Sequence, residues 1–284
     1  MRQITSIYYI YIIIMNNLNL ADYYTRNKNE FFGEDGHKKL LVGLKKNVTN
    51  INDINCKIVG IDVGCCIGNY IPNINAICME QNNKILCFEP NPVNILALEP
   101  KINKDNNLKL FKHCVSNETI TTSFYNSNNS KNNTGNELAG LRSGGKKICD
   151  VDVKKLDDVL DYEFNDENII IKFIKIDTEG NDTNVIKGLE KYLPKTKYII
   201  FECSDCLDDI RGPGIKNPMK DIVDFLSKNG FDTYRIGTKK LFKVNDEYWN
   251  QVYDDLKFWS NCFSLKKDDD LIYKLINKNF DYIY

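Results

Sequence analysis

The sequence predicts an α/β protein whose centre is a doubly wound, mostly parallel β-sheet. Three apolar runs of strand length, at 58–63, 84–89 and 169–177, each end in carboxylates. Segments with the helical spacing of apolar residues follow them, and such alternation produces parallel strands joined by right-handed crossovers. At 284 residues the chain is long enough for one large domain, or for one domain with an extension.

The first of these strands ends in a turn that contains glycine. Residues 58–69 read IVGIDVGCCIGN, so Asp62 closes the strand and Gly64 and Gly68 bracket the turn. Glycine has no Cβ, and the backbone can therefore come close to a ligand there. A helix is expected next, with Pro72 near its start, where the missing N–H is tolerated.

The second strand ends in another carboxylate. Residues 84–92 read KILCFEPNP, which places Glu89 at the strand end and Asn91 just after it. An acidic strand end, a turn of the form Gly-x-x-x-Gly and a second acidic strand end are typical of a nucleoside-binding crevice in an open α/β sheet. We therefore expect Glu89 to accept the hydroxyl protons of a ribose.

The turn also distinguishes between two kinds of nucleoside ligand. A dinucleotide fingerprint of the form G-x-G-x-x-G holds a pyrophosphate at a helix N-terminus, but Cys66 occupies the middle glycine position here. Asp62 lies two residues before the turn, where negative charge repels phosphate and suits a sulfonium or ammonium group. The pattern favours S-adenosylmethionine over NAD; the alternative is a strand and a tight turn that bind no ligand.

The third strand ends in a cluster of acidic residues. Residues 169–180 read IIIKFIKIDTEG, so Asp177 and Glu179 follow the strand, and a helix is expected over 182–192. Asp177, Glu179 and Asp182 also form a candidate site for a divalent cation, because Mg²⁺ prefers oxygen ligands. Nothing in the spacing fixes octahedral geometry, however, and we expect no resident metal.

The remaining elements continue the alternation. Between the second and third motifs, strands are expected at 108–115, 121–125 and 151–153, helices at 93–101 and 156–160, and a polar loop over 126–147. After the third motif, strands are expected at 197–202, 231–236 and 259–265, and a helix at 218–229 that Gly230 ends. A loop of this length is typical of a lid or of a disordered segment. Arg142 is its candidate anion contact, with a solvated side chain as the alternative.

The ordered motifs resemble those of the FkbM family of S-adenosylmethionine-dependent methyltransferases. That family reads approximately IDVGANIG, FEPNP, LDD, IKIDVEGxE with a trailing LKG, and a strand end of the form EC or Ex. The matching segments of this chain are 61–68, 88–92, 156–158, 174–182 with 186–188, and 201–202. The chain departs from the pattern at Cys65 and Cys66, where Ala and Asn are usual, and at Asp182, where Glu is usual.

The resemblance extends over about residues 56–265. It implies a class I methyltransferase fold, in which a Rossmann-like sheet has seven strands and the last is antiparallel. It also implies O-methylation of a hydroxyl on a sugar, a glycan or a small metabolite. N-methylation of an amine or a protein side chain is one alternative, and a catalytically inactive nucleoside-binding partner module is another.

The strand ends receive individual roles in this interpretation. Asp62, Glu89, Asp177 and Glu202 should ring the crevice. Asp177 is the first choice for positioning or deprotonating the acceptor and Glu179 is the second, with capping of the next helix as its alternative. Residues expected to bind the donor are Asp62, Gly64, Gly68, Asn69, Glu89, Asn91, Val115 and Ser116. Asp62 should reach the amino group of the donor and Val115 or Ser116 should border its adenine, whereas His113 is expected to be structural.

The composition limits which binding partners and which cellular compartment are expected. The net charge is −1 and both signs are mixed along the chain, so we expect no binding of nucleic acid. The ten cysteines show no disulfide framework, and the pair Cys203 and Cys206 lacks the second ligand pair of a structural zinc site. A reducing compartment such as the cytoplasm is the better interpretation. The sequence leaves the oligomeric state open.

Two segments precede the predicted methyltransferase domain at 56–284. The apolar run within residues 1–15 is too short to span a bilayer, so no stable membrane insertion is expected. A signal, a weak anchor, disorder or an untranslated leader are the alternatives for it. Residues 16–55 are expected to be a helical lead-in, in which Leu40, Leu41 and Leu44 have helical spacing. This lead-in is either a lid or part of the core.

Overall fold

The computed structural model describes residues 21–31, 34–51, 55–80, 82–126, 139–141, 145–165, 168–202, 218–278, 280 and 282–283. These fall into two compact units, one with the described residues between Val48 and Glu202 and the other with those up to Asn47 and from Pro218 onward. Three predictions lie outside the described residues: those for segment 1–15, for Arg142 with most of the 126–147 loop, and for the Cys203 and Cys206 pair. The domain boundaries stay predictions.

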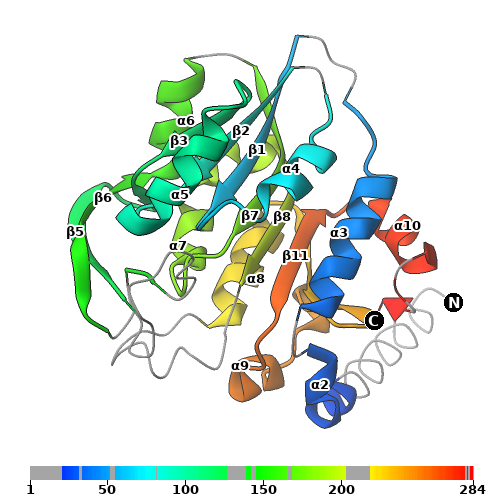
Figure 1. Cartoon of the computed structure of the whole chain (residues 1–284). Coiled ribbons are helices and arrows are strands. Elements are labelled where there is room, and N and C mark those ends of the chain that lie inside the picture. The colour runs from blue at the N-terminus through cyan, green and yellow to red at the C-terminus, as the bar shows by residue number, and fades with distance from the viewer. Residues whose placement is uncertain are drawn as a thin grey trace, which may run out of the picture. The chain divides into compact units, whose positions relative to one another are not determined.

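The first unit contains a parallel sheet with the strand order β8-β7-β1-β2-β3. Its strands are β1 (Lys57–Val63), β2 (Asn83–Phe88), β3 (Leu108–Phe111), β7 (Ile169–Ile176) and β8 (Thr196–Glu202). All neighbouring pairs are parallel. From β1 the chain adds β2 and β3 in one direction, and β7 and β8 lie in the other (Figure 1). Such a reversal of strand order is where ligands bind in open α/β sheets.

Helices connect these strands. They are α4 (Ile71–Ile77), α5 (Pro92–Ile102), α6 (Leu156–Phe164), α7 (Asp182–Lys187) and the 3₁₀ helix η1 (Glu190–Lys195). Right-handed crossovers that run in opposite directions from one point place their helices on opposite faces of a sheet. Strands covered on both faces are apolar throughout, and β1 and β7 are buried over nearly their whole length. The predicted doubly wound sheet is therefore confirmed.

The predicted helix over 182–192 is wrong in its extent. α7 ends at Lys187, and a separate 3₁₀ helix begins at Glu190. A Cβ on the intervening Gly188 would lie 1.9 Å from the carbonyl oxygen of Ser116. The backbone of Gly188 is thus pressed against β4, and this tertiary contact interrupts the helix.

A smaller sheet in the same unit has the order β4-β6-β5. Its strands are β4 (Cys114–Ser116), β5 (Ile120–Tyr125) and β6 (Lys147–Lys155). The single strand predicted over 108–115 is therefore wrong, because the chain leaves the main sheet after β3 and β4 pairs with β6 instead. The short strand predicted at 151–153 is also too short. Exposed and buried residues alternate along part of β6, as expected for a sheet with one solvated face. Because the exposed positions are polar, the strand does not stand out as an apolar run in the sequence.

The second unit contains strands in the order β12-β10-β9-β11. They are β9 (Phe231–Ile236), β10 (Lys240–Lys243), β11 (Asn261–Lys266) and β12 (Tyr282–Ile283). β9 is antiparallel to both β10 and β11, so the antiparallel last strand that the resemblance implies is present. The resemblance implies seven strands; the described residues contain five in the parallel sheet of the first unit and four in the second unit.

The helices of this unit include the N-terminal lead-in. They are α2 (Lys28–Phe31), α3 (Asp35–Asn47), α8 (Met219–Lys228), α9 (Val252–Leu256), α10 (Leu271–Lys278) and the 3₁₀ helix η2 (Asp246–Tyr248). Phe31 packs against Phe242 with ring centroids 4.7 Å apart, and Leu40 and Leu44 are fully buried. The described part of the lead-in thus lies in a core, as one of its two interpretations expected. Among the described helices, none combines the length and the apolar character needed to cross a bilayer.

Candidate functional site

The turn after β1 depends on glycine for two reasons. Gly64 has φ 73°, which side chains other than glycine rarely adopt. A Cβ on Gly64 would also lie 1.9 Å from the carbonyl oxygen of Asp177. The Asp177 amide donates to the carbonyl oxygen of Val63 at 3.0 Å, so the ends of β1 and β7 are in direct backbone contact.

Glu89 fastens this turn to the end of β2. Its Oε2 accepts a hydrogen bond from the amide of Cys66 at 2.7 Å, and its Oε1 accepts one from the amide of Asn91 at 2.8 Å. Burial raises the pKa of Glu89 to about 7, although these hydrogen bonds oppose the shift. The side-chain amide of Asn94 donates a longer hydrogen bond to Oε1, at 3.5 Å. A carboxylate has roughly four acceptor sites, so Glu89 keeps capacity for a hydroxyl of a ligand.

Cys66 presents its amide to Glu89 from an unusual backbone conformation. Its φ is 49°, in the left-handed region that L-residues other than Asn and Asp seldom occupy. The side chain at this position is therefore held in a strained turn at the edge of the pocket. Asn, which is usual here in the family that the sequence resembles, tolerates this conformation better.

A pocket lies beside the turn. Gly64 and Glu89 line it from the main sheet, Val115 and Phe124 from the smaller sheet, and Asp177 from the end of β7. Two sheets of the same unit therefore contribute to one concave surface.

His113 adds an aromatic side to the pocket. Its ring lies 5.7 Å from that of Phe88 and 5.6 Å from that of Phe111. Nδ1 lies 2.9 Å from the carbonyl oxygen of Cys114, so Nδ1 carries the proton and donates it. Burial lowers the pKa of His113. The ring is thus neutral at pH 7, with Nε2 as its remaining acceptor.

The structure brings some of the predicted donor-binding residues together and places others elsewhere. Gly64, Glu89 and Val115 line the pocket. Asp62, Gly68 and Ser116 are buried, Asn69 is exposed, and Asn91 caps α5 by accepting a hydrogen bond from the amide of Val93. Contact between any of these residues and a donor stays a prediction.

Asp62 is fully buried in β1, and its counter-charge comes from the neighbouring strand. Neither carboxylate oxygen accepts a hydrogen bond from the described residues. The ammonium nitrogen of Lys175 lies 3.6 Å from Oδ1, and the two residues are register partners of β1 and β7. Burial raises the pKa of Asp62, and Lys175 opposes that shift.

Lys175 lies within the matched motif at 174–182, but no role was predicted for it from the sequence. Its Nζ donates to the carbonyl oxygen of Gly64 at 3.1 Å and lies 3.4 Å from Oδ2 of Asp177. Burial alone would lower the pKa of Lys175, but Asp177 and Asp62 outweigh it and hold the pKa above its ordinary value. A lysine in an otherwise apolar strand must be buried with a partner, and that signal in IIIKFIKI could have identified it.

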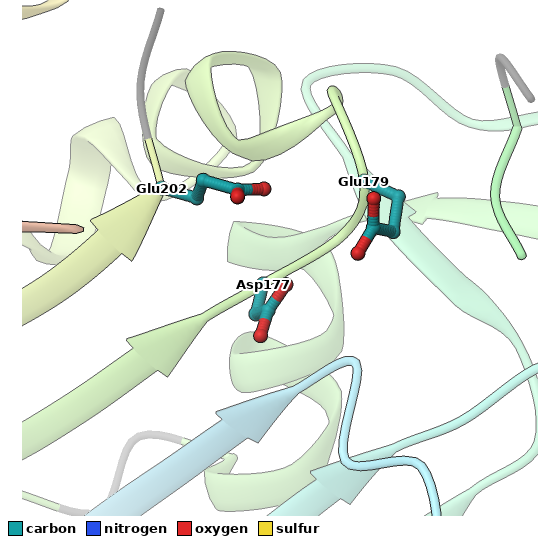
Figure 2. Close-up of side chains that lie close together, drawn as sticks. All are labelled: Asp177, Glu179 and Glu202. Atoms are coloured by element: carbon teal, nitrogen blue, oxygen red, sulfur yellow. The ribbon is translucent and has the colours of Figure 1, made fainter. Parts of the chain in front are cut away.

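The carboxylate of Asp177 also lies close to those of Glu179 and Glu202. Figure 2 shows Asp177 and Glu202 at the ends of β7 and β8 and Glu179 on the loop after β7, all facing a common space. Oxygen atoms of the three lie within 4.8 Å of one another. The Asp177 side chain is 44% exposed, so it is accessible to a ligand. The two predicted catalytic residues, Asp177 and Glu179, thus do lie together.

Asp182, a member of the candidate cation site named from the sequence, is not part of this convergent set. Its Oδ2 accepts hydrogen bonds from the amide and the hydroxyl of Thr178, at 3.3 and 2.8 Å, and its Oδ1 accepts one from the amide of Glu202 at 3.3 Å. Burial raises the pKa of Asp182 to about 6, and Asp177 adds to the shift. Asp182 therefore ties the β7 turn to the end of β8, and Glu202 takes its place in the candidate cation site.

The chemistry of the pocket fits a cationic nucleoside. Gly64 lines the pocket, and Glu89 offers acceptors beside it. The buried charge of Asp62 has no hydrogen-bond donor among the described residues, and Asp177, Glu179 and Glu202 add negative charge nearby. Negative potential of this kind attracts a positively charged ligand and disfavours a pyrophosphate.

The chain is similar to known methyltransferases. The sequence model described as the methyltransferase FkbM domain matches residues 62–233. Among solved structures, the methyltransferase FkbM from Methylobacillus flagellatus KT is 12% identical with a TM-score of 0.44, and the match covers 86% of this chain and 58% of that one. An O-methyltransferase from Bacillus cereus in complex with SAH is 9% identical with a TM-score of 0.41, over 90% of both chains. None of the curated proteins compared with this chain matches it.

Proposed function

Because the chain belongs to the FkbM methyltransferase family, we propose that it transfers a methyl group from S-adenosylmethionine to a hydroxyl of a sugar, a glycan or a small metabolite. One observation carries the proposal. Asp177 is a half-exposed carboxylate at the end of β7 that lines the same pocket as Glu89. A proton acceptor and a nucleoside-binding carboxylate therefore face one cavity.

The donor is held, in this proposal, by the turns after β1 and β2. Glu89 accepts a ribose hydroxyl on the acceptor capacity that Cys66, Asn91 and Asn94 leave open. Gly64 lines the pocket beside the methionine part, and Asp62 reaches the amino group of the donor directly or through water. Val115 borders the adenine. S-adenosylmethionine supplies an electrophilic methyl group on a positively charged sulfur.

The residues of this chain then align the acceptor and take its proton. A methyl transfer is an in-line displacement, so most of the acceleration comes from proximity and orientation. As the oxygen–carbon bond forms, the hydroxyl proton passes to the carboxylate of Asp177. Glu179 is the second candidate for holding the acceptor, because its carboxylate shares the same space.

The acidic surroundings also support a second acceptor class. Asp177, Glu179 and Glu202 suit an ammonium group, so an amine that loses its proton to Asp177 is the alternative substrate. Nucleic acid is disfavoured, because the net charge of the chain is −1 and these carboxylates repel phosphate. An inactive nucleoside-binding module is the alternative without catalysis.

Formation of S-adenosylhomocysteine tests the proposal. The protein is incubated with S-adenosylmethionine and panels of sugars, polyols and amines, and methylated products are identified by mass spectrometry. Asp177→Asn should bind the donor normally in calorimetry but lose turnover by about 10²–10⁴-fold, the usual contribution of a general base. Asp150→Asn, which changes an exposed carboxylate of β6, is the control and should behave like the wild type.

Each alternative has its own outcome in this assay. Product formation on amines alone would replace the hydroxyl by the nitrogen acceptor, and donor binding without any product would favour the inactive module. Normal turnover by Asp177→Asn would remove the base assignment. A chelator should leave the activity unchanged, because the proposed displacement uses no metal; a loss that Mg²⁺ restores would assign a cation to Asp177, Glu179 and Glu202.

We also propose that the protein works in a reducing compartment such as the cytoplasm. Among the described residues, Cys65 and Cys87 are buried free thiols that pack as small apolar residues. Mass spectrometry of alkylated protein, taken from cells without reduction, should find these thiols unpaired.

A further inference from the structure

Lys175 occupies the junction between the donor side and the acceptor side of the site. Its ammonium group is 3.1 Å from the carbonyl oxygen of Gly64 and 3.4 Å from Oδ2 of Asp177. The third neighbour is Oδ1 of Asp62 at 3.6 Å. An ammonium has three N–H donors, and three oxygen atoms, each from a different part of the site, surround this one.

The position of this ammonium is itself tightly fixed. Lys175 pairs with Asp62 in the register of β7 and β1, and its side chain is 9% exposed. The ring of Tyr70 covers it, with the centroid 5.5 Å from Nζ. Asp177, by contrast, is 44% exposed and follows the strand, so its carboxylate has far more conformational freedom.

We propose that Lys175 is a positioning residue for methyl transfer, which anchors the exposed carboxylate of Asp177 to the Gly64 turn that cradles the donor. The inference rests on the proposed function, because it concerns how the same reaction is aligned. Lys175 lies behind Asp177 and touches neither donor nor acceptor in this arrangement. Its effect passes through one carboxylate oxygen, and the other oxygen is left for the acceptor.

The expected consequence follows from the geometry of in-line transfer. Without the ammonium, the Asp177 side chain loses the cationic contact that the structure records and rotates toward water. A displacement of about 1 Å in a reacting or positioning group costs about 10²-fold in rate. The binding of the donor to Gly64, Glu89 and Val115 does not require the Lys175–Asp177 contact.

The test must separate positioning from folding. Lys175→Met alone leaves the charge of Asp62 buried without its counter-charge, which destabilises a protein strongly. The informative variant is therefore Lys175→Met combined with Asp62→Asn, which removes both buried charges. The matched control is Lys172→Met with Glu80→Gln, which removes the other buried lysine–carboxylate pair of β7.

Four measurements are made on the wild type and both double variants: the thermal midpoint, the Kd for S-adenosylmethionine, kcat at saturating donor, and a crystal structure. For the Lys175→Met, Asp62→Asn variant we expect folded protein, a kcat lowered about a hundredfold and a carboxylate of Asp177 that has moved. Because Asp62 is itself a proposed donor contact, a change in Kd does not decide the question, and kcat at saturation does. The control should keep the wild-type kcat.

The outcomes separate the two proposals. Wild-type protein that forms no S-adenosylhomocysteine with any acceptor overturns the proposed function, and the crystal structure then still tests the placement of Asp177. A wild-type kcat in the Lys175→Met, Asp62→Asn variant, or an Asp177 carboxylate that keeps its position there, overturns the role of Lys175. An equal loss of kcat in the control also overturns it, because buried charge pairs of β7 would then act only through stability.

Discussion

Two lysines of β7, three residues apart, have different ion-pair partners and lie in different surroundings. Lys172 and Lys175 are both buried and both ion-paired. Lys172 forms its salt bridge with Glu80, whose Oε1 also accepts a hydrogen bond from the amide of Ile51. Lys175 forms salt bridges with Asp62 and Asp177 and also contacts the Gly64 turn. The Lys172–Glu80 salt bridge holds two chain segments together, whereas Lys175 and its partners lie where the strand ends meet the pocket.

The difference teaches that burial and charge do not by themselves mark a functional residue. Lys172 lies at the irregularity where β7 shifts its register against β1, between the partners of Val59 and Gly60. Lys175 lies one residue from the carboxyl end of the strand, and in open α/β sheets ligands bind outside these ends. The position along the strand, rather than the chemistry of the side chain, separates structure from function here.

The largest expected effect is on the pair that is remote from the pocket. Lys172→Met leaves Glu80 buried without its cation, so the free energy of unfolding should fall by about 3–5 kcal/mol. Urea denaturation measures this loss, and calorimetry should find the donor affinity of the folded fraction unchanged. Adding Glu80→Gln should restore most of the stability. A large loss of donor affinity in Lys172→Met would erase the distinction between the two lysines.

The next effect concerns a buried carboxylate in the pocket that has no lysine partner among the described residues. Glu89→Ala removes the acceptor of the Cys66 and Asn91 amides and of the proposed ribose hydroxyls. Unpaired buried polar groups cost about 1–3 kcal/mol, so calorimetry should show donor binding weakened by about 5- to 150-fold. Glu80→Gln, which changes a carboxylate remote from the pocket, should leave the Kd for the donor unchanged. An unaltered Kd in Glu89→Ala would contradict the ribose role.

A pH dependence of intermediate size follows from Glu89. Its pKa is raised to about 7 in the folded protein, above its ordinary value of 4.5. The folded state therefore binds this proton more tightly than the unfolded state, so stability is lost as pH rises from about 4.5 to about 7. The donor-free protein should gain about 1–2 kcal/mol of stability between pH 7.5 and 5.5 from this group.

Chemical denaturation at several pH values measures this gain, and the Glu89→Gln variant shows how much of it comes from Glu89. Donor affinity should change in the opposite direction, since ionised Glu89 is the better acceptor of ribose hydroxyls. Equal slopes in the wild type and in Glu89→Gln would assign the pH dependence to other groups.

The smallest expected effect is relief of strain in the turn. Cys66 has φ 49°, and Asn tolerates this conformation better, so Cys66→Asn should raise stability by about 0.5–1 kcal/mol. The amide of residue 66 still reaches Glu89, so the Kd for the donor should stay the same. Lys257→Asn, at φ 44° in the other unit, is the matched control and should also stabilise the protein. A stabilisation confined to Lys257→Asn would mean that the Cys66 side chain contributes favourably to the turn.

The acidic strand ends could be predicted because they are local in the sequence. Asp62, Glu89 and Asp177 each follow or close an apolar run, and parallel strands must bring their carboxyl ends to one edge. The positive φ of Gly64 is also a local property, whereas its close approach to the Asp177 carbonyl is a contact between strand ends. The members of the predicted catalytic pair, Asp177 and Glu179, are separated by one residue in the chain.

The roles of Lys175, Asp182 and Glu202 were decided by contacts between strands. Asp182 looks like a member of an acidic cluster in the sequence, but its two oxygens are occupied by Thr178 and by the Glu202 amide. The extent of β4 and of α7 was also fixed by partners, because β4 pairs with β6 and Gly188 is pressed against Ser116. Of these partners, only Thr178 is close in the sequence to the residue that it contacts.

The sequence by itself determined the main alternation of strands and helices, the glycine turn and the carboxylates at the strand ends, because each of these depends on residues close together in the chain. Only the tertiary structure decided which charges face the pocket and which are occupied elsewhere. The physical reason is that a buried charge must have a partner. For Lys175 that partner is Asp62, which reaches it across the sheet from β1.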